Sequence, residues 1–97
     1  MFLIQALLTN DNDQDYKHNI IIGLFTSSEK AILAARNWLK EEREGGSKDN
    51  IVLYGWCLTP DIIEMCPTDM SKDDAALEIS KAFRSIEKEF PITSSDE

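Results

Sequence analysis

Residues 18–42, HNIIIGLFTSSEKAILAARNWLKEE, change their hydrophobic period once, and this change decides the fold. Residues 18–25 are rich in β-branched and aromatic side chains, a composition typical of a strand. From residue 27 to about residue 44, apolar side chains recur at intervals of three and four residues, the period of a helix packed on one face. The stretch therefore predicts a strand that runs directly into an amphipathic helix.

A hydroxyl cluster, Thr26, Ser27 and Ser28, lies at this junction. Thr26 and Glu29 match the capping box, in which a hydroxyl accepts a hydrogen bond from a backbone N–H three residues later and the glutamate reaches back. A nucleophilic serine would need a neighbouring base, and His18 lies at the other end of the strand. We therefore interpret the cluster as a helix cap, and we expect no catalytic residue and no enzymatic activity.

Two more strands and a second helix are predicted by the same criteria. Residues 2–9 and 51–59 are short and almost wholly apolar, which favours strands in the interior of a sheet. Ser71 begins a second amphipathic helix and Pro91 ends it. Gly23 lies within a predicted strand, which indicates a bulge or a close approach by another segment.

The elements follow in the order strand, strand, helix, strand, helix. A right-handed crossover makes the third strand parallel to the second, so the simplest sheet places the first strand between them. We predict an α+β fold with a three-stranded antiparallel sheet of order 2-1-3 and two helices. Residues 1–92 form a single domain, and residues 93–97 form an acidic tail that we expect to be disordered.

The face of this sheet opposite the first helix would be strongly apolar. It would carry Leu3, Leu7, Tyr54, Trp56 and Leu58. Such a face is too apolar to remain in contact with water. Either the second helix covers it or a second copy of the protein does, which would make a homodimer through the sheet face.

The third strand supplies the candidate binding residues. Tyr54 and Trp56 share one face of it, and both ring types are enriched at protein interfaces. Asp61 and Glu64 follow the strand and would add an acidic rim. We predict these four as binding residues, with packing of the two rings beneath the second helix as the alternative.

The charge of the chain limits its partners. Eighteen acidic residues against ten basic ones give a net charge of −8, which repels nucleic acid and anionic membranes and favours a basic protein partner. The apolar run at the N-terminus is too short for a signal peptide or a membrane span, so we expect a cytoplasmic protein. Cys57 and Cys66 are then expected to be reduced thiols, with a disulfide left open.

We expect neither a metal nor a cofactor. Asp11, Asp13 and Asp15 alternate as at the start of a calcium loop, but Tyr16 and Ile22 occupy the positions where that loop requires glycine and glutamate. A zinc site is also unsupported, because the chain has one histidine and two cysteines. The aspartates are typical of a solvated hairpin loop.

The pattern IIIGLFTSSEKAILAARNWLKEE, followed by IVLYGWCLTPD, resembles small bacterial and phage-encoded domains of unknown function. Gly23, Phe25, Ser28, Glu29 and Ala31 carry the likeness, which extends over about the first sixty residues. The resemblance implies a strand, helix and strand core of the kind derived above. It implies no activity and no functional residue.

Two functions from different classes remain. The first is a small acidic binding module without catalysis, a protein–protein interaction or inhibitor protein of the immunity or phage accessory type. The second is a protein that binds a small nucleotide-like or signalling ligand in a pocket formed by Tyr54, Trp56 and the loop after Pro60.

Overall fold

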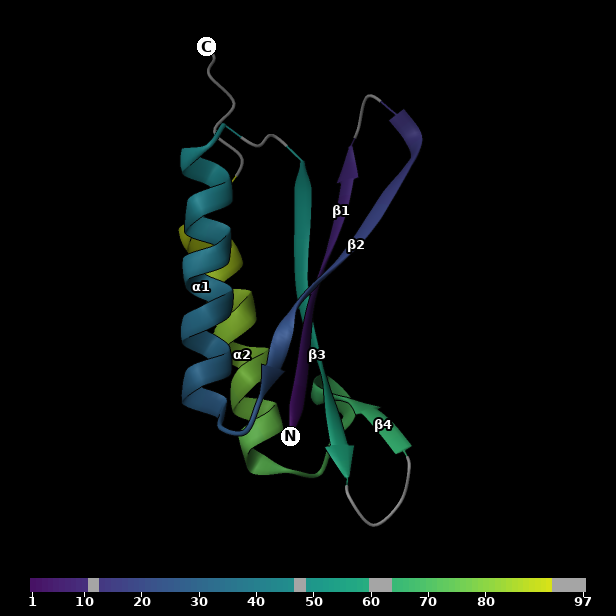
Figure 1. The fold of residues 1–97 in the computed structure, drawn as a ribbon, viewed down its shortest axis with the longest axis vertical. Coiled ribbons are helices and arrows are strands. Elements are labelled where there is room, and N and C mark those ends of the chain that lie inside the picture. The colour runs from purple at the N-terminus through teal and green to yellow at the C-terminus, as the bar shows by residue number, and fades with distance from the viewer. Residues whose placement is uncertain (11–12, 47–48, 60–63, 92–97) are drawn as a thin grey trace.

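A computed structural model describes residues 1–10, 13–46, 49–59 and 64–91 of the 97-residue chain (Figure 1). The predicted tail, residues 93–97, lies outside the described residues. The elements are β1 (Phe2–Asn10), β2 (Asp13–Phe25), α1 (Ser28–Glu44), β3 (Asn50–Thr59), β4 (Glu64–Pro67), a short 3₁₀ helix η1 (Thr68–Met70) and α2 (Asp74–Glu89). No helix among the described residues is long and apolar enough to cross a membrane.

The four strands form one antiparallel sheet in the order β2-β1-β3-β4. The α+β fold and the predicted order of the three long strands are confirmed, but the three-stranded sheet was incomplete. Strand β4 lies in a stretch that we predicted as a loop, and it pairs with residues 56–59 of β3. Pro67 ends this pairing because it has no N–H to donate to the ladder.

Strand β2 is longer than predicted and contains a bulge. It begins at Asp13 rather than at residue 18, so its polar first residues belong to the hairpin rather than to a loop. Ile4 pairs with Gly23 while Gln5 pairs with Ile21, which leaves Ile22 as the extra residue of a β-bulge. Of the two alternatives that the mid-strand glycine predicted, a bulge or a close approach, the bulge is present, with its extra residue directly before Gly23.

Both helices pack on the same face of the sheet (Figure 1). Helix α2 lies beneath β3, and α1 lies beside α2 and contacts β2 and β1. The common core contains Phe2, Ile4, Ala6, Leu8, Ala31, Ala35, Leu39, Ile51, Leu53, Cys57, Ala76, Ile79, Phe83 and Ile86. The second helix therefore does not cover the opposite face, and that alternative is excluded.

Helix α1 begins at the hydroxyl cluster, as predicted, but with a different cap. The hydroxyl of Ser27 accepts a 3.2 Å hydrogen bond from the Lys30 backbone N–H, whereas the side chain of Thr26 is exposed. The cluster is a helix cap and the capping residue is Ser27, one position later than we predicted. The helix ends before two glycines, of which Gly46 has a φ of +90°.

Helix α2 begins at Asp74 rather than at Ser71. Asp73 is its N-cap, with a carboxylate oxygen that accepts a 2.9 Å hydrogen bond from the Ala75 N–H. The hydroxyl of Ser71 accepts a 3.0 Å hydrogen bond from the Asp73 N–H and so fixes the approach to the cap.

Two arginines of α1 hold the far end of α2. Arg36 makes a bidentate pair with Glu89 at 2.6 and 3.3 Å, which raises the pKa of the arginine and lowers the pKa of the glutamate. Arg43 donates 3.1 and 2.9 Å hydrogen bonds to the backbone carbonyls of Phe90 and Asp49. Burial lowers the pKa of the Arg43 guanidinium, and the charge of Asp49 opposes this shift.

Candidate functional site

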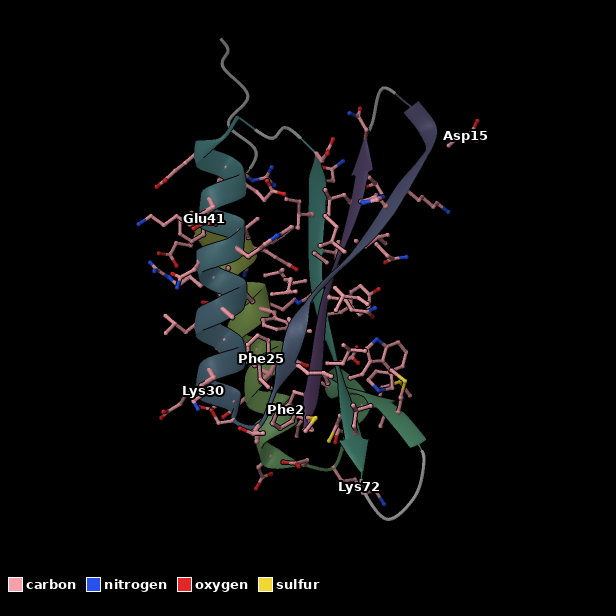
Figure 2. The ribbon with its side chains drawn as sticks, in the orientation of Figure 1. Phe2, Asp15, Phe25, Lys30, Glu41 and Lys72 are labelled. Atoms are coloured by element: carbon pink, nitrogen blue, oxygen red, sulfur yellow. The ribbon has the colours of Figure 1, made fainter. Side chains whose placement is uncertain are left out.

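The face of the sheet that points away from both helices is the candidate site, and we call it the open face. Antiparallel partners share a face, so the registers of the four strands define its members. They are Leu3, Gln5, Leu7, Thr9, Lys17, Asn19, Ile21, Leu24, Asn50, Val52, Tyr54, Trp56, Leu58, Met65 and Pro67. Figure 2 shows side chains projecting from the sheet on this side, where no other described element faces them.

Large apolar side chains are exposed on the open face. Ile21 is 65% exposed, Leu24 56%, Met65 50% and Val52 42%. These four make up half of the large apolar side chains that are exposed among the described residues. Apolar residues gathered in this way mark an interaction surface, because isolated monomers seldom leave a large contiguous apolar patch in water.

Two aromatic rings lie at the centre of the open face and are fixed there by hydrogen bonds to other strands. The Tyr54 hydroxyl donates a 2.7 Å hydrogen bond to Oδ1 of Asn19 on β2. The Trp56 indole Nε1–H donates a 2.8 Å hydrogen bond to Oε1 of Gln5 on β1. Both donors are therefore satisfied within the chain, and the rings present a preformed surface.

Of the four predicted binding residues, the structure brings together Tyr54 and Trp56. The alternative that they pack beneath the second helix is wrong, because that helix lies on the other side of the sheet. Asp61 lies outside the described residues. The backbone of Glu64 begins β4, and its side chain lies outside the described part of the chain.

Sequence reasoning missed the contribution of β2 to this face. Ile21 and Leu24 are three residues apart, so strict alternation would place them on opposite faces. The bulge at Ile22 shifts the alternation and brings both onto the open face. The signal in the sequence was Gly23, because a glycine within a strand predicts a bulge. A bulge with its extra residue directly before Gly23 would have placed Ile21 and Leu24 on the same face.

Charge is distributed unevenly between the two layers. Among the described residues at the paired registers of the open face, Lys17 alone is charged, and it lies toward the hairpin tip. Charged side chains are instead frequent on the helices, and Figure 2 shows Lys30 and Glu41 pointing from α1 away from the sheet. The centre of the open face is therefore uncharged in a chain of net charge −8, and its two amide side chains, Gln5 and Asn19, accept hydrogen bonds from the rings.

A groove of about 520 Å³ lies at the free edge of β3, beside the open face. It is lined by Val52, Tyr54, Gly55, Pro67, Thr68, Asp69, Leu77, Ser80, Lys81 and Arg84. Thr68 and Asp69 of η1 belong to this lining, and Ser80 of α2 donates a 2.7 Å hydrogen bond to the Thr68 hydroxyl. The groove exists because β4 covers only the last residues of β3 and leaves the edge before Trp56 unpaired by any described strand.

Side chains of α2 occupy part of this edge. The Leu53 backbone N–H donates a 2.6 Å hydrogen bond to the Glu87 carboxylate, and the Leu53 carbonyl accepts a hydrogen bond from Arg84. Arg84 and Glu87 also form an ion pair at 3.4 Å. The two side chains thus satisfy backbone groups that would otherwise offer a template for another strand.

The described residues hold no cluster suited to a metal or to nucleophilic catalysis. Within the ranges that the structure describes, no three histidine, cysteine, aspartate or glutamate side chains gather to hold a metal ion. Ser27 is engaged as a helix cap, and His18 is exposed opposite Leu8 in the hairpin. Cys57 and Cys66 are cross-strand partners and both are free thiols. The arrangement offers a surface for binding.

Comparison with protein-family models, with curated proteins and with solved structures finds no match for this chain. The resemblance to small bacterial and phage-encoded domains therefore stays an expectation.

Proposed function

We propose that this protein is a non-catalytic protein-binding module that binds through the open face of its sheet. The observation that carries this proposal is the uncovered layer of apolar side chains around Tyr54 and Trp56. Both helices lie on the other side, so no described element of the chain shields this layer from water. Burial against a partner is the way to remove it from water.

A protein surface suits the open face better than a small molecule does. The face extends across a whole sheet, and protein interfaces bury broad areas with an apolar centre. Tyrosine and tryptophan at such a centre contribute most of the binding energy, commonly about 2 kcal/mol or more for each anchor. Tyr54 and Trp56 are held in place by hydrogen bonds before binding, so little side-chain freedom is lost on association.

An inhibitor or accessory protein is the kind of module that these properties fit. Such a protein acts by covering another protein and needs no catalytic residue. The net charge of −8 would accelerate its encounter with a basic partner over distances up to about a Debye length, roughly 8 Å at physiological salt. Contact on the open face would then be made by apolar groups.

Site-specific photo-crosslinking in the cells that produce the protein tests this proposal. A photoreactive residue at Leu24, on the open face, is compared with one at Leu33 on α1, because the two leucines are equally exposed at 56% and 58%. We expect discrete protein adducts from position 24 that disappear when Trp56→Ala is added, and none from position 33. Absence of adducts at position 24, or equal adducts at both positions, would contradict the proposal.

A second candidate function is the binding of a small anionic ligand in the groove beside β3. Its volume of about 520 Å³ falls in the range of small-molecule sites, about 300–1,000 Å³. Its charged lining residues are Lys81, Arg84 and Asp69, and because Arg84 is paired with Glu87, Lys81 is the cation that favours a ligand with a phosphate or carboxylate group such as a nucleotide.

Thermal denaturation with a panel of nucleotides tests this second function. A nucleotide that binds the folded state raises the melting temperature, and the shift grows with the logarithm of its concentration once this exceeds the dissociation constant. The shift should vanish in Lys81→Ala and persist in Lys88→Ala, a change of an exposed lysine of the same helix outside the groove. No shift with any nucleotide, or an equal shift in both variants, would contradict it.

A further inference from the structure

We propose that the occupant of the open face is a second copy of this chain, packed sheet against sheet with both helix layers outside. This inference rests on the proposed function, because it names the partner of the same surface. Three properties of the open face support it: the distribution of charge, the size of the face and the state of its polar atoms.

The distribution of charge favours an uncharged apolar surface opposite the open face. A partner that placed cations against the centre of the open face would find no carboxylate there at any described paired register, so the surface that covers this centre must be apolar. Burying such unpaired charges is costly. A second open face is itself apolar and uncharged at its centre. In the sheet-to-sheet arrangement the charged helices of the two copies lie on opposite outer sides, where their repulsion is weakest.

The size of the open face suits a dimer that uses the whole of it. Strands β1, β2 and β3, spaced about 4.8 Å apart, are together about 14 Å wide and about 30 Å long, and the four residues of β4 add about 13 Å of a fourth strand. The flat projection is therefore about 500 Å², and the relief of the side chains enlarges it. A standard interface buries about 800 Å² on each partner, so the whole open face would be used.

The two ring donors at the centre of the open face already have acceptors within the chain. The Tyr54 hydroxyl and the Trp56 indole N–H already donate to Asn19 and Gln5, so covering the rings leaves neither donor without a partner. Stacked sheets lie about 10 Å apart with their strands at about 30°. A twofold axis through the centre of the face would bring Val52, beside Leu7, close to the same region of the second copy.

Sedimentation equilibrium of the full chain tests the dimer. We expect a species with twice the chain mass of 11.0 kDa. Val52→Glu should raise the dissociation constant of the dimer by about a hundredfold or more, because it places a carboxylate on each side of the interface. Leu33→Glu adds the same charge at an exposed position of α1 and should leave the dissociation constant unchanged. Added salt should leave the dimer as tight or tighten it, because each chain carries a net charge of −8.

Three results would overturn the dimer: a wild-type monomer at the highest soluble concentration, a Val52→Glu chain that still dimerises, or a dimer that salt dissociates. Circular dichroism confirms that each variant is folded. Ile21→Lys, at the most exposed large apolar side chain of the open face among the described residues, is the second variant if Val52→Glu unfolds, and the same loss of dimer is expected.

Crosslinking separates failure of the dimer from failure of the proposed function. A wild-type monomer whose position 24 crosslinks to a different protein, in a manner that Trp56→Ala abolishes, would overturn the dimer and support the binding module. A wild-type monomer without adducts at position 24 would overturn both. Adducts of the chain with itself at position 24 would support both.

Discussion

The rings of Tyr54 and Trp56 meet edge to face, with their centroids 6.4 Å apart and their planes at 77°. Each ring is also tied to a different strand, Tyr54 to Asn19 of β2 and Trp56 to Gln5 of β1. One aromatic pair thus spans three strands at the centre of the open face. This rigidity distinguishes the pair from aromatic residues that are merely exposed, because a fixed ring loses less entropy when a partner binds.

Asn19→Ala should weaken association without unfolding the chain. It removes the acceptor of the Tyr54 hydroxyl, so the ring gains freedom and its donor must be desolvated without a partner when the face is covered. The expected loss is about 1 kcal/mol per ring, or roughly fivefold in the dissociation constant for each copy. Sedimentation measures this change. Asn37→Ala, at an exposed position of α1, should have no effect, and equal effects of the two changes would refute the role of the bond.

Glu87→Ala should destabilise the fold at the free edge of β3. It leaves the Leu53 N–H without its acceptor in a partly buried position, which costs about 1–3 kcal/mol of the free energy of unfolding. Glu87→Gln keeps an acceptor oxygen and should lose less. Urea denaturation provides the values, with Glu78→Ala as the control at an exposed position of the same helix. Equal values for Glu87→Ala and Glu78→Ala would show that the edge is not held by this contact.

Ser27→Ala should cost about 1 kcal/mol of the free energy of unfolding, because it removes the side-chain acceptor of the Lys30 N–H at the start of α1. Thr26→Ala, one residue earlier, should be nearly neutral because the Thr26 side chain is exposed and does not cap the helix. Chemical denaturation of both variants distinguishes the two positions. A larger loss of unfolding free energy in Thr26→Ala than in Ser27→Ala would show that Thr26 is the capping residue.

The ion pair between Arg36 and Glu89 predicts a pH dependence. The hydrogen bond from Arg36 holds the pKa of Glu89 below its ordinary value, so the pair stabilises the folded state above that value, about 4.3. This contribution is lost as the pH falls through the lowered pKa and Glu89 becomes protonated. The wild type should therefore exceed Glu89→Gln in stability at neutral pH, by a small margin because the pair is largely exposed, and the difference should close in acid. If the wild type were still more stable than Glu89→Gln at about pH 2, the difference in stability could not come from the ion pair between Arg36 and ionised Glu89.

The long elements could be predicted from the sequence because each has a strong period. The apolar runs of β1 and β3 and the stripe of α1 require burial whatever their neighbours do. Strand β4 could not be predicted, since its four residues end in a proline and are stable only because β3 offers them an unpaired edge. The start of β2 was missed for a related reason, because polar residues pair there as part of a hairpin.

The sequence also could not predict which face of the sheet α2 covers. The apolar stripe of α2 predicts that the helix packs on a sheet, but it does not determine the face. The chain reaches α2 through β4 and η1, which return it to the side of α1, and there Phe83 and Ile79 complete one core. Tyr54 and Trp56 could be recognised as binding candidates, but their exposure depends on this choice of side. Their anchors, Gln5 and Asn19, became visible only once the strands were in register.

The accessibility of Trp56 to solvent shows whether a second copy covers the open face. The chain has two tryptophans, so Trp38→Phe leaves Trp56 as the single indole fluorophore. Acrylamide quenching of its fluorescence is then measured as the protein concentration rises. We predict strong quenching in dilute solution that falls as the dimer forms, and no such fall when Val52→Glu is added. If quenching were the same at every protein concentration, Trp56 would not be covered by a second copy, and the proposed dimer would be wrong.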